Sequence, residues 1–282
     1  MSGSTHSCIP DRGSFSGSSE GVIPRRPNLF RALGRAEPPA TIDIEGRRYS
    51  REAVLKHDSW AATAVFRDPD GQRVACKFNR THPLFCVPMR WLGRRLAQRE
   101  WDAMQRLNGT EGVPTPVGPI SADGVLLPNA VAHRWIEGET FKPWLRVDEL
   151  FFPRLHELIA TLHSLDMAYV DMSKWENILV GTDGRPYLLD YQIHFHLPRR
   201  GPAGWVLRWF QAADLYYLHR QWLRARPDQV SPADRETWIR QPGLVLVCET
   251  LGAPWRWFRL RVLALFGVKI DPRRAGQPPA QP

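Results

Sequence analysis

The sequence is poor in the features that mark secreted and membrane-spanning proteins. Its few cysteines form no Cys-x-x-Cys motif, which excludes the common zinc spacings and favours reduced thiols in a cytoplasm; they are Cys8, Cys76, Cys86 and Cys248. No uninterrupted apolar run of about 18 residues occurs, so no membrane-spanning helix is expected. Residues 1–26 are rich in serine and glycine and lack the apolar core of a signal peptide. We therefore expect a cytoplasmic protein without a structural metal.

The composition is that of a folded protein with a strong positive charge. With 282 residues, of which 43% are hydrophobic, the chain can bury a substantial core in one large domain or two lobes. The net charge of +9 suggests an anionic partner such as a nucleotide, a nucleic acid or an acidic lipid surface. Arginine-rich composition alone can also produce this charge. We expect disordered tails over residues 1–40 and 271–282.

A polar loop followed by two short apolar strands is the most informative part of the sequence. Asp171 and Asn177 lie in this loop, directly before the apolar run Ile178-Leu179-Val180. The turn Thr182-Asp183-Gly184 predicts a reversal into a second strand that ends at Asp190. Such a hairpin brings Asn177 beside Asp190, and hard oxygen ligands gathered there suit Mg²⁺ carrying phosphates. Aspartate and asparagine beside a strand are also common as ordinary turn formers.

The N-terminal half contains a second hairpin signal and an amphipathic helix. The turn sequence Asp68-Pro69-Asp70-Gly71 separates two apolar runs, and the second run contains Lys77. Apolar residues recur at threes and fours between Arg94 and Leu107, which predicts a helix that carries Glu100. Lys77 could be a solvated strand residue, and Glu100 could pair with nearby arginines on an exposed face.

The order of these elements resembles that of the protein-kinase-like superfamily. A predicted helix over residues 152–165 leads into the polar loop and its two strands, and Val74-Ala75-Cys76-Lys77 resembles the Val-Ala-Ile-Lys strand of kinases. The resemblance extends from about Leu55 to Arg224. It implies an α+β fold of two lobes, with a small antiparallel-sheet N-lobe over residues 41–138 and a mainly helical, shortened C-lobe over residues 139–270.

The resemblance also implies a role for each polar residue singled out above. Lys77 would hold the α- and β-phosphates of ATP, and Glu100 would fix Lys77. Asp171 would be the catalytic carboxylate that orients the acceptor hydroxyl. Asn177 and Asp190 would bind Mg²⁺.

Two further segments would complete the nucleotide site through their backbones. The first replaces the Gly-x-Gly-x-x-Gly loop of kinases, which this chain lacks, and its small residues would let amides approach the phosphates. The second resembles the kinase hinge, where backbone groups would meet an adenine ring, although a glycine after an apolar strand is also an ordinary turn. The residues concerned are Ser59, Trp60, Ala61 and Ala62 in the first segment, and Arg134, Trp135 and Ile136 in the second.

The catalytic segment departs from the superfamily pattern at three places. Tyr169-Val170-Asp171 stands for His-Arg-Asp, and Asp190-Tyr191-Gln192 stands for Asp-Phe-Gly. Asn177 follows Asp171 by six residues, where five is usual.

The stretch after Asp190 is short, and it bears on the acceptor. Asp214 resembles the buried aspartate of the next helix, and no Ala-Pro-Glu motif precedes it. A peptide substrate needs an extended platform, whereas a small or membrane-presented hydroxyl needs only a basic cleft. Arg199, Arg200 and Arg208 could line such a cleft or be ordinary surface charge.

The C-terminal residues 254–269 mix tryptophan, phenylalanine and leucine with arginine and lysine. This composition suits a peripheral contact with a membrane interface. A C-terminal helix that packs on the C-lobe has the same pattern.

Together these features predict an ATP- and Mg²⁺-dependent phosphotransferase. The acceptor would be a protein serine or threonine, a small molecule or a lipid-linked sugar. Within the superfamily, the chain resembles compact bacterial serine/threonine-kinase-like proteins, including lipopolysaccharide-core and sugar kinases. The alternatives are a pseudokinase and a basic membrane or nucleic-acid adaptor, although we expect no nucleic acid as a partner. The expected location is the cytoplasm, either free or at a membrane surface.

Overall fold

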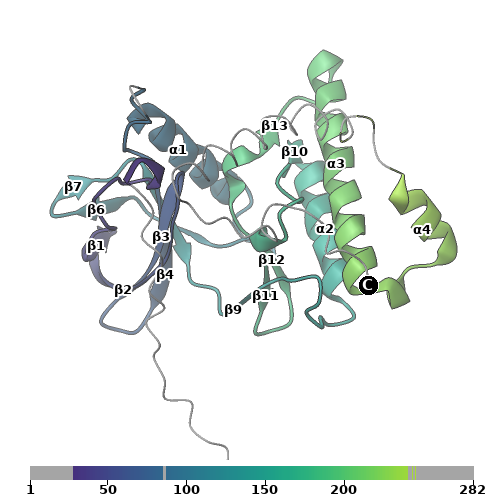
Figure 1. Ribbon diagram of the computed structural model, residues 1–282, viewed down its shortest axis with the longest axis horizontal. Coiled ribbons are helices and arrows are strands. Elements are labelled where there is room, and N and C mark those ends of the chain that lie inside the picture. Colours follow the sequence, from purple (N-terminus) through teal and green to yellow (C-terminus); the bar gives the residue numbers. More distant parts are fainter. Residues whose placement is uncertain (1–27, 85–86, 241–242, 244, 246–282) are drawn as a thin grey trace, which may run out of the picture.

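The computed structural model describes residues 28–84, 87–240, 243 and 245, and it shows an α+β protein of two parts that lie side by side (Figure 1). An antiparallel sheet with one helix forms the N-terminal part, and helices with short strands form the C-terminal part. The chain passes from one part to the other where β8 (Ala130–Arg134) ends and β9 (Gly138–Thr140) begins. This is the two-lobed α+β architecture that the sequence predicts.

Within the described residues, the N-terminal sheet has eight strands, all paired antiparallel, in the order β5-β8-β4-β3-β2-β1-β6-β7. Besides β8, they are β1 (Thr41–Ile44), β2 (Arg47–His57), β3 (Ala61–Arg67), β4 (Arg73–Asn79), β5 (Pro116–Val117), β6 (Ile120–Ala122) and β7 (Val125–Leu126). One face buries a core that includes Ile42, Phe66 and Phe78. Because side chains alternate along a strand, Phe78 and Lys77 of β4 lie on opposite faces.

The predicted hairpin between β3 and β4 is present. The two strands pair in continuous register from Ala61 opposite Asn79 to Arg67 opposite Arg73. In the turn, the Asp68 carboxylate accepts a hydrogen bond from the N–H of Gln72 at 2.7 Å. The local turn chemistry recognised in the sequence therefore closes this hairpin.

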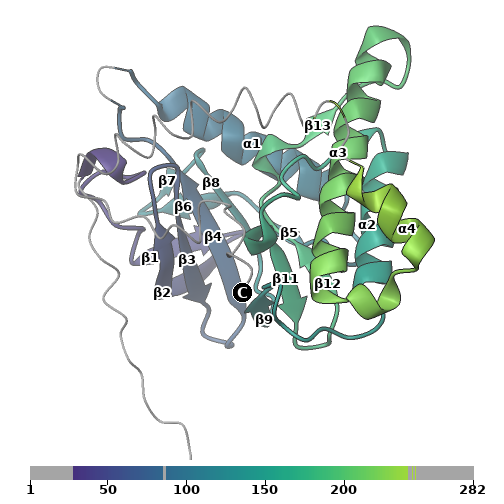
Figure 2. The same ribbon diagram turned by 45° about the vertical axis from the view of Figure 1, so that its right-hand side comes forward.

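Helix α1 (Arg90–Arg106) packs against β4 and β8 (Figure 2) and contains most of the amphipathic helix predicted between Arg94 and Leu107, but it begins four residues earlier. Its buried residues include Glu100 and Met104. Near its start, a Cβ atom at Gly93 would lie 2.3 Å from the carbonyl oxygen of Arg80. The helix can approach the chain this closely because residue 93 has no side chain.

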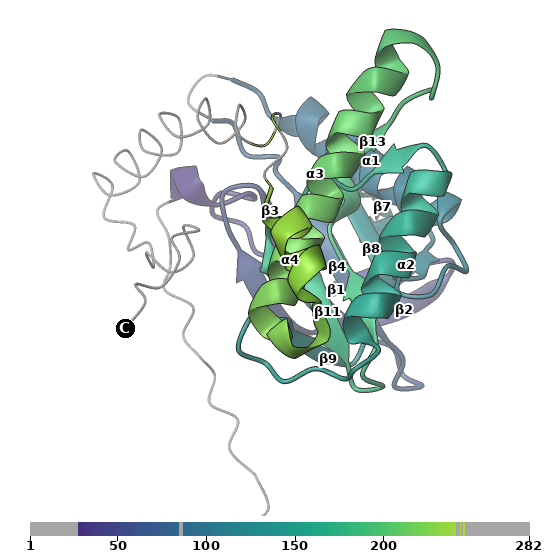
Figure 3. The same cartoon turned by 90° about the vertical axis from the view of Figure 1, so that its right-hand side faces the viewer.

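Among the described residues, three helices form most of the C-terminal part: α2 (Phe151–Ser164), α3 (Gly201–Ala225) and α4 (Pro232–Ile239). Helices α2 and α3 lie side by side, and α4 packs against α3 (Figure 3). The apolar face predicted for α2 is buried; it consists of Leu155, Leu158, Ile159 and Leu162. Burial of this stripe positions the polar loop that follows the helix.

The second predicted hairpin, β11 (Ile178–Gly181) and β12 (Pro186–Leu188), is also present, with β9 as its third strand. It lies between the N-terminal sheet and the helices (Figures 1 and 2). A short pair, β10 (Met167–Ala168) and β13 (Phe195–His196), flanks it in sequence. The short 3-10 turns are η1 (Asn28–Phe30), η2 (Trp175–Asn177), η3 (Tyr191–Ile193) and η4 (Pro227–Gln229).

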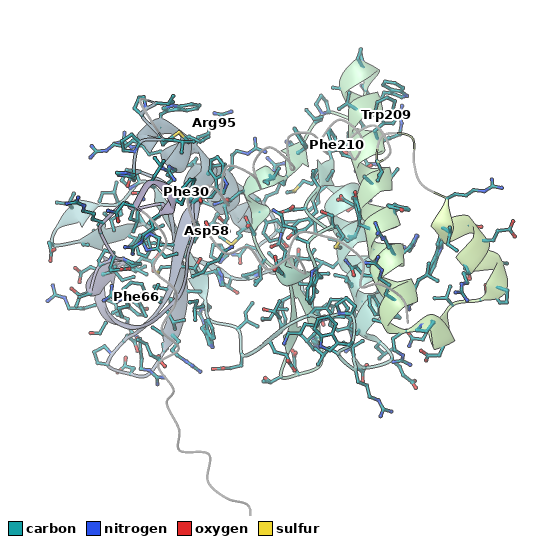
Figure 4. The ribbon with its side chains drawn as sticks, in the orientation of Figure 1. Phe30, Asp58, Phe66, Arg95, Trp209 and Phe210 are labelled. Atoms are coloured by element: carbon teal, nitrogen blue, oxygen red, sulfur yellow. The ribbon has the colours of Figure 1, made fainter. Side chains whose placement is uncertain are left out.

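Residues 28–40 are folded, which corrects the expectation of a disordered tail over residues 1–40. Phe30 and Ala32 are buried, and the N–H of Ala32 donates to the carbonyl of Asp58 at 2.7 Å. Figure 4 shows Phe30 and Asp58 at the same end of the sheet. Composition missed this contact because the few apolar residues of the segment are buried only by docking on the sheet.

Several expectations concern residues outside the described ranges. These are the tails over 1–27 and 271–282, the basic aromatic segment 254–269, and Cys8, Cys86 and Cys248. Cys76 is buried, and burial raises the pKa of its thiol. Among the described residues, no helix is long and apolar enough to cross a membrane.

We expect Gly93→Ala to lower the free energy of unfolding by about 1–3 kcal/mol, because the new methyl group would overpack against the Arg80 carbonyl. This loss should exceed the ~1 kcal/mol by which alanine is the better helix former. Urea denaturation measures the change. As a control, Gln105→Ala at an exposed position of the same helix should shift the free energy by no more than about 0.5 kcal/mol. A Gly93→Ala protein as stable as the parent would contradict the packing argument.

Candidate active site

Lys77 lies between two carboxylates that come from different elements. Its Nζ is 3.2 Å from Oε2 of Glu100 on α1 and 2.7 Å from Oδ1 of Asp190, which follows β12. The side chains of Lys77 and Glu100 keep only 16% and 5% of their surface exposed. The predicted ion pair between strand and helix is therefore present, and Asp190 is a second partner.

Burial and mutual charge shift the pKa values of Lys77, Glu100 and Asp190. Burial raises the pKa of Glu100 to about 7; the charge of Asp190 adds to this shift and that of Lys77 opposes it. Burial also disfavours the Lys77 ammonium, but the two carboxylates outweigh it and raise the pKa of Lys77. At Asp190, burial favours the neutral acid, yet Lys77 lowers the pKa below its ordinary value. At neutral pH, Lys77 and Asp190 are charged, while Glu100 is near its midpoint.

Asp171 is held by two donors from its own loop. Its Oδ2 accepts hydrogen bonds from Nζ of Lys174 at 2.7 Å and from Nδ2 of Asn177 at 2.8 Å. Asp171 and Asn177 are buried, whereas Lys174 is about half exposed. Sequence reasoning missed Lys174; the available signal was a basic residue three positions after the candidate catalytic acid.

The β11–β12 hairpin brings Asn177 and Asp190 to the same end, as predicted. The N–H of Leu189 donates to the carbonyl of Asn177 at 2.8 Å, and Asp190 is the next residue. Between Asp171 and β11 the loop contains η2, in which the N–H of Asn177 donates to the carbonyl of Lys174. An amide oxygen and a carboxylate at one strand end fit Mg²⁺, which proteins commonly hold with one or two carboxylates, waters and substrate phosphates.

A buried carboxylate supports the backbone before Asp171. Asp214 of α3 accepts hydrogen bonds from the N–H groups of Tyr169 and Val170, each at 2.7 Å, and from His163 at 3.1 Å. Val170 has φ 70°, a left-handed conformation that a β-branched residue rarely adopts. Burial raises the pKa of Asp214, and these donors counteract the shift. The resemblance to kinases predicted that Asp214 is a buried aspartate, and the structure shows that it binds the backbone before Asp171.

Helix α1 is tied to the segment after Asp190 by contacts that the sequence did not reveal. Arg99 donates to the carbonyls of Gln192 and His194, the first at 3.1 Å. The side chain of Gln192 donates to Asn79 of β4. These bonds join residues far apart in the chain and have no local sequence pattern, so pattern reasoning could not find them.

The segment expected to cover the phosphates has most of its amides engaged. Asp58 accepts hydrogen bonds from the N–H groups of Trp60 at 2.8 Å and Ala61 at 3.0 Å. Ser59 donates through Oγ to the carbonyl of Phe30, and Ala62 pairs with β2. This corrects the expectation of free amides at Trp60 and Ala61, because Asp58 caps the turn, and at Ala62, which is paired in the sheet. Among the described residues, no hydrogen bond engages the N–H of Ser59.

The hinge-like segment is partly engaged as well. The N–H of Arg134 donates to the carbonyl of Thr115, and the N–H of Trp135 donates to the carbonyl of Arg73, at 2.9 and 3.0 Å. Within the described part of the chain, the N–H of Ile136 makes no backbone hydrogen bond. Of the three predicted residues, Ile136 is thus the one whose N–H could meet an adenine ring.

Comparison with known proteins finds similar solved structures at low sequence identity. No protein-family model and no curated protein sequence matches the chain. The complex of Rio2 kinase with ADP/Mg²⁺-phosphoaspartate from Chaetomium thermophilum is 16% identical, covers 69% of this chain and 63% of its own, and has a TM-score of 0.49. Another Rio2 kinase structure from that organism is 14% identical, covers 65% and 61%, and has a TM-score of 0.46. The chain spans less than two thirds of these kinases, so the site assignments rest on the contacts described above.

We expect the stability of the wild type relative to Glu100→Gln to fall as the pH rises from about 4.5 to above 7. The folded protein holds the Glu100 proton more tightly than the unfolded chain, because its pKa is about 7 instead of 4.5. The stabilisation by protonated Glu100 is therefore fully present below pH 4.5 and is lost as the pH rises through about 7. In total it amounts to a free energy on the order of 3 kcal/mol. Glutamine does not titrate. The opposite shift of Asp190 acts below pH 4, outside this window.

Urea denaturation of both proteins at a series of pH values tests this expectation. Glu157→Gln, at an exposed carboxylate on α2, serves as the control and should follow the wild type at every pH. A constant difference between wild type and Glu100→Gln across the window would show that Glu100 does not titrate there.

Proposed function

We propose that the protein is an ATP- and Mg²⁺-dependent phosphotransferase that acts on a hydroxyl acceptor. The observation that carries this proposal is the position of two charged clusters at one hairpin. Lys77 with Glu100 and Asp190 forms the first cluster, and Asp171 with its loop donors forms the second. The strand end at Asn177 and Asp190 connects them.

Each side chain has a task that its surroundings support. Lys77 would bind the α- and β-phosphates, and Glu100 would keep its ammonium in place when Asp190 turns to a metal. Asp171 is held through Oδ2, which leaves Oδ1 to orient the acceptor hydroxyl and receive its proton. Lys174 would neutralise charge on the transferred phosphoryl group.

Asn177 and Asp190 would hold Mg²⁺, which supplies charge neutralisation on the phosphates when it is bound. Before nucleotide binds, Lys77 compensates the Asp190 carboxylate. This pairing keeps Lys77 and Asp190 charged and in position in the free protein. Less reorganisation is then required when nucleotide and Mg²⁺ bind.

A pseudokinase is the second candidate, and one observation favours it. The Asp58 carboxylate occupies two amides in the segment that would cover the phosphates. A carboxylate at this place also repels phosphate, so nucleotide affinity would depend mainly on Lys77 and the metal.

For the acceptor we propose a small or lipid-linked sugar hydroxyl in preference to generic protein serine or threonine. Arg199 does not line an open cleft, because it binds Asp166 and the carbonyls of His163 and Ser164 at the end of α2. Arg200 and Arg208 remain exposed nearby and suit a phosphorylated or anionic acceptor. We place the protein in the cytoplasm, with a peripheral membrane contact through residues 254–269 as part of the same proposal.

ATP with Mg²⁺ should raise the melting temperature by several degrees, because ligand at 100 times its Kd stabilises the folded state by about 2.7 kcal/mol. Asp190→Ala should abolish the part of the shift that requires Mg²⁺. Glu176→Ala, at an exposed acid of the catalytic loop, is the matched control and should retain the full shift. An unchanged Mg²⁺-dependent shift in Asp190→Ala would refute the metal assignment and favour the pseudokinase.

Asp171→Asn should lower phosphoryl transfer by roughly 10²–10⁴-fold, the usual contribution of general-base catalysis, while nucleotide binding stays within a few-fold. Transfer of radiolabelled phosphate from ATP to sugar, lipid and protein fractions measures the effect and identifies the acceptor class. Strong Asp171-dependent labelling of serine or threonine in unrelated proteins, with none in sugar or lipid fractions, would overturn the acceptor proposal.

A further inference from the structure

A cavity lies along α1, away from the candidate active site. It has a volume of about 670 Å³ and is bounded by α1, by Pro128 and by the segment that contains β13. Neither Lys77 nor Asp171 nor Asp190 lines it, so it is separate from the candidate active site. Its basic lining residues are Arg94, Arg95, Arg99, Arg106, His194 and His196.

The arginines of the cavity are arranged as a stripe. Arg95, Arg99 and Arg106 recur at spacings of four and seven along α1, which places them on one face of the helix. Arg95 projects from α1 at the edge of the molecule (Figure 4). Glu100 follows Arg99 directly and therefore faces another direction, toward Lys77.

The positive charge of this stripe is not balanced by neighbouring acids. Asp102 is the one acid that lines the cavity, and it accepts a hydrogen bond from Gln98 at 2.7 Å. Arg94 and Arg95 are exposed and form no ion pair with the residues that the structure describes. Arg99 donates to neutral carbonyls, which leaves its charge uncompensated. Like charges held this close repel one another, and an anion would relieve the repulsion.

We propose that this cavity binds a ligand that carries several phosphate groups. The stripe from Arg95 to Arg106 is about 16 Å long at 1.5 Å per residue. One phosphate group binds donors at about 2.8 Å and cannot reach both ends, whereas several phosphates on one scaffold can. Arginine forks suit phosphate oxygens, and the exposed ring of Trp91 adds an apolar wall for the scaffold. The ligand is a free polyphosphorylated small molecule or the headgroup of a polyphosphorylated lipid.

The same ligand would couple to the active site, and this step rests on the proposed function. It would bridge Arg99 and Arg106 of α1 to His196 of the segment that follows Asp190. Such a bridge holds α1 in the position in which Glu100 meets Lys77. Ligand and nucleotide would then raise each other's affinity by the same factor.

Isothermal titration of the full chain with inositol hexakisphosphate tests the site without nucleotide. We expect saturable binding that the double variant Arg94→Gln/Arg95→Gln weakens by at least about 10–100-fold, which is the usual worth of one charge-assisted hydrogen bond. Both side chains are exposed, so the fold should persist; equal melting temperatures check this. The control is Arg146→Gln/Arg235→Gln, which removes the same charge from exposed positions elsewhere and should bind as the wild type does.

No binding, or equal weakening in the two double variants, would overturn the site. Tighter Arg94- and Arg95-dependent binding of a mixed-sequence oligonucleotide than of the probe would also overturn it, in favour of a nucleic-acid surface. Binding to vesicles that contain phosphatidylinositol bisphosphate, but not to phosphatidylcholine vesicles, identifies the headgroup as the source. Probe binding that leaves nucleotide affinity unchanged would refute the coupling, whereas a failure of phosphoryl transfer alone would leave the measured site intact.

Discussion

The charge of Lys77 connects the two parts of the molecule. Its ammonium is largely buried and contacts Glu100 on α1 and Asp190 at the end of the β11–β12 hairpin. A buried ammonium requires such compensation, since removal of one partner from a buried pair leaves an unbalanced charge. The sheet, the helix and the hairpin are therefore joined by the charge compensation of Lys77. The position of α1 determines whether Glu100 can reach the Lys77 ammonium.

Helix α1 makes contacts with two different faces, and one of them provides the Glu100 partner of Lys77. Gly93 lets its first turn approach the Arg80 carbonyl closely, and Glu100 then reaches Lys77. On the neighbouring face, Arg99 binds the backbone carbonyls that follow Asp190 and belongs to a basic cavity. One rigid helix thus carries the inner ion pair and the outer arginine stripe, so that an anion at the outer face and a nucleotide at the inner face would act on the same element.

The catalytic loop depends on another buried charge. Asp214 binds two successive backbone N–H groups and thereby stabilises the left-handed conformation of Val170, directly before Asp171. Strained backbone of this kind costs on the order of 1–3 kcal/mol and persists when the surrounding structure supports it. The direction of the Asp171 side chain is in this way set by a residue on α3, far away in the sequence.

The sequence by itself determined the features that depend on neighbouring residues. Turn residues at Asp68 to Gly71 and Thr182 to Gly184 specify both hairpins, and apolar periodicity specifies α1 and α2, because these signals act within a few residues. The order of motifs, through the resemblance to kinases, selected Lys77 and Glu100 as an ion pair and Asp190 as a residue of the same site, whereas the contact between Lys77 and Asp190 came from the structure. In the same way, a resemblance in motif order suggested the two-lobed fold.

Tertiary structure decided what depends on contacts between distant residues. Composition gave no sign that residues 28–40 dock on the sheet, or that Gln192 reaches Asn79. The N–H groups of Trp60 and Ala61 bind the Asp58 carboxylate, although the small residues of this segment had suggested amides that are free to bind phosphate. Each of these outcomes is a hydrogen bond or a burial whose partner is chosen by the packing of the whole chain, and such partners have no fixed spacing in a sequence.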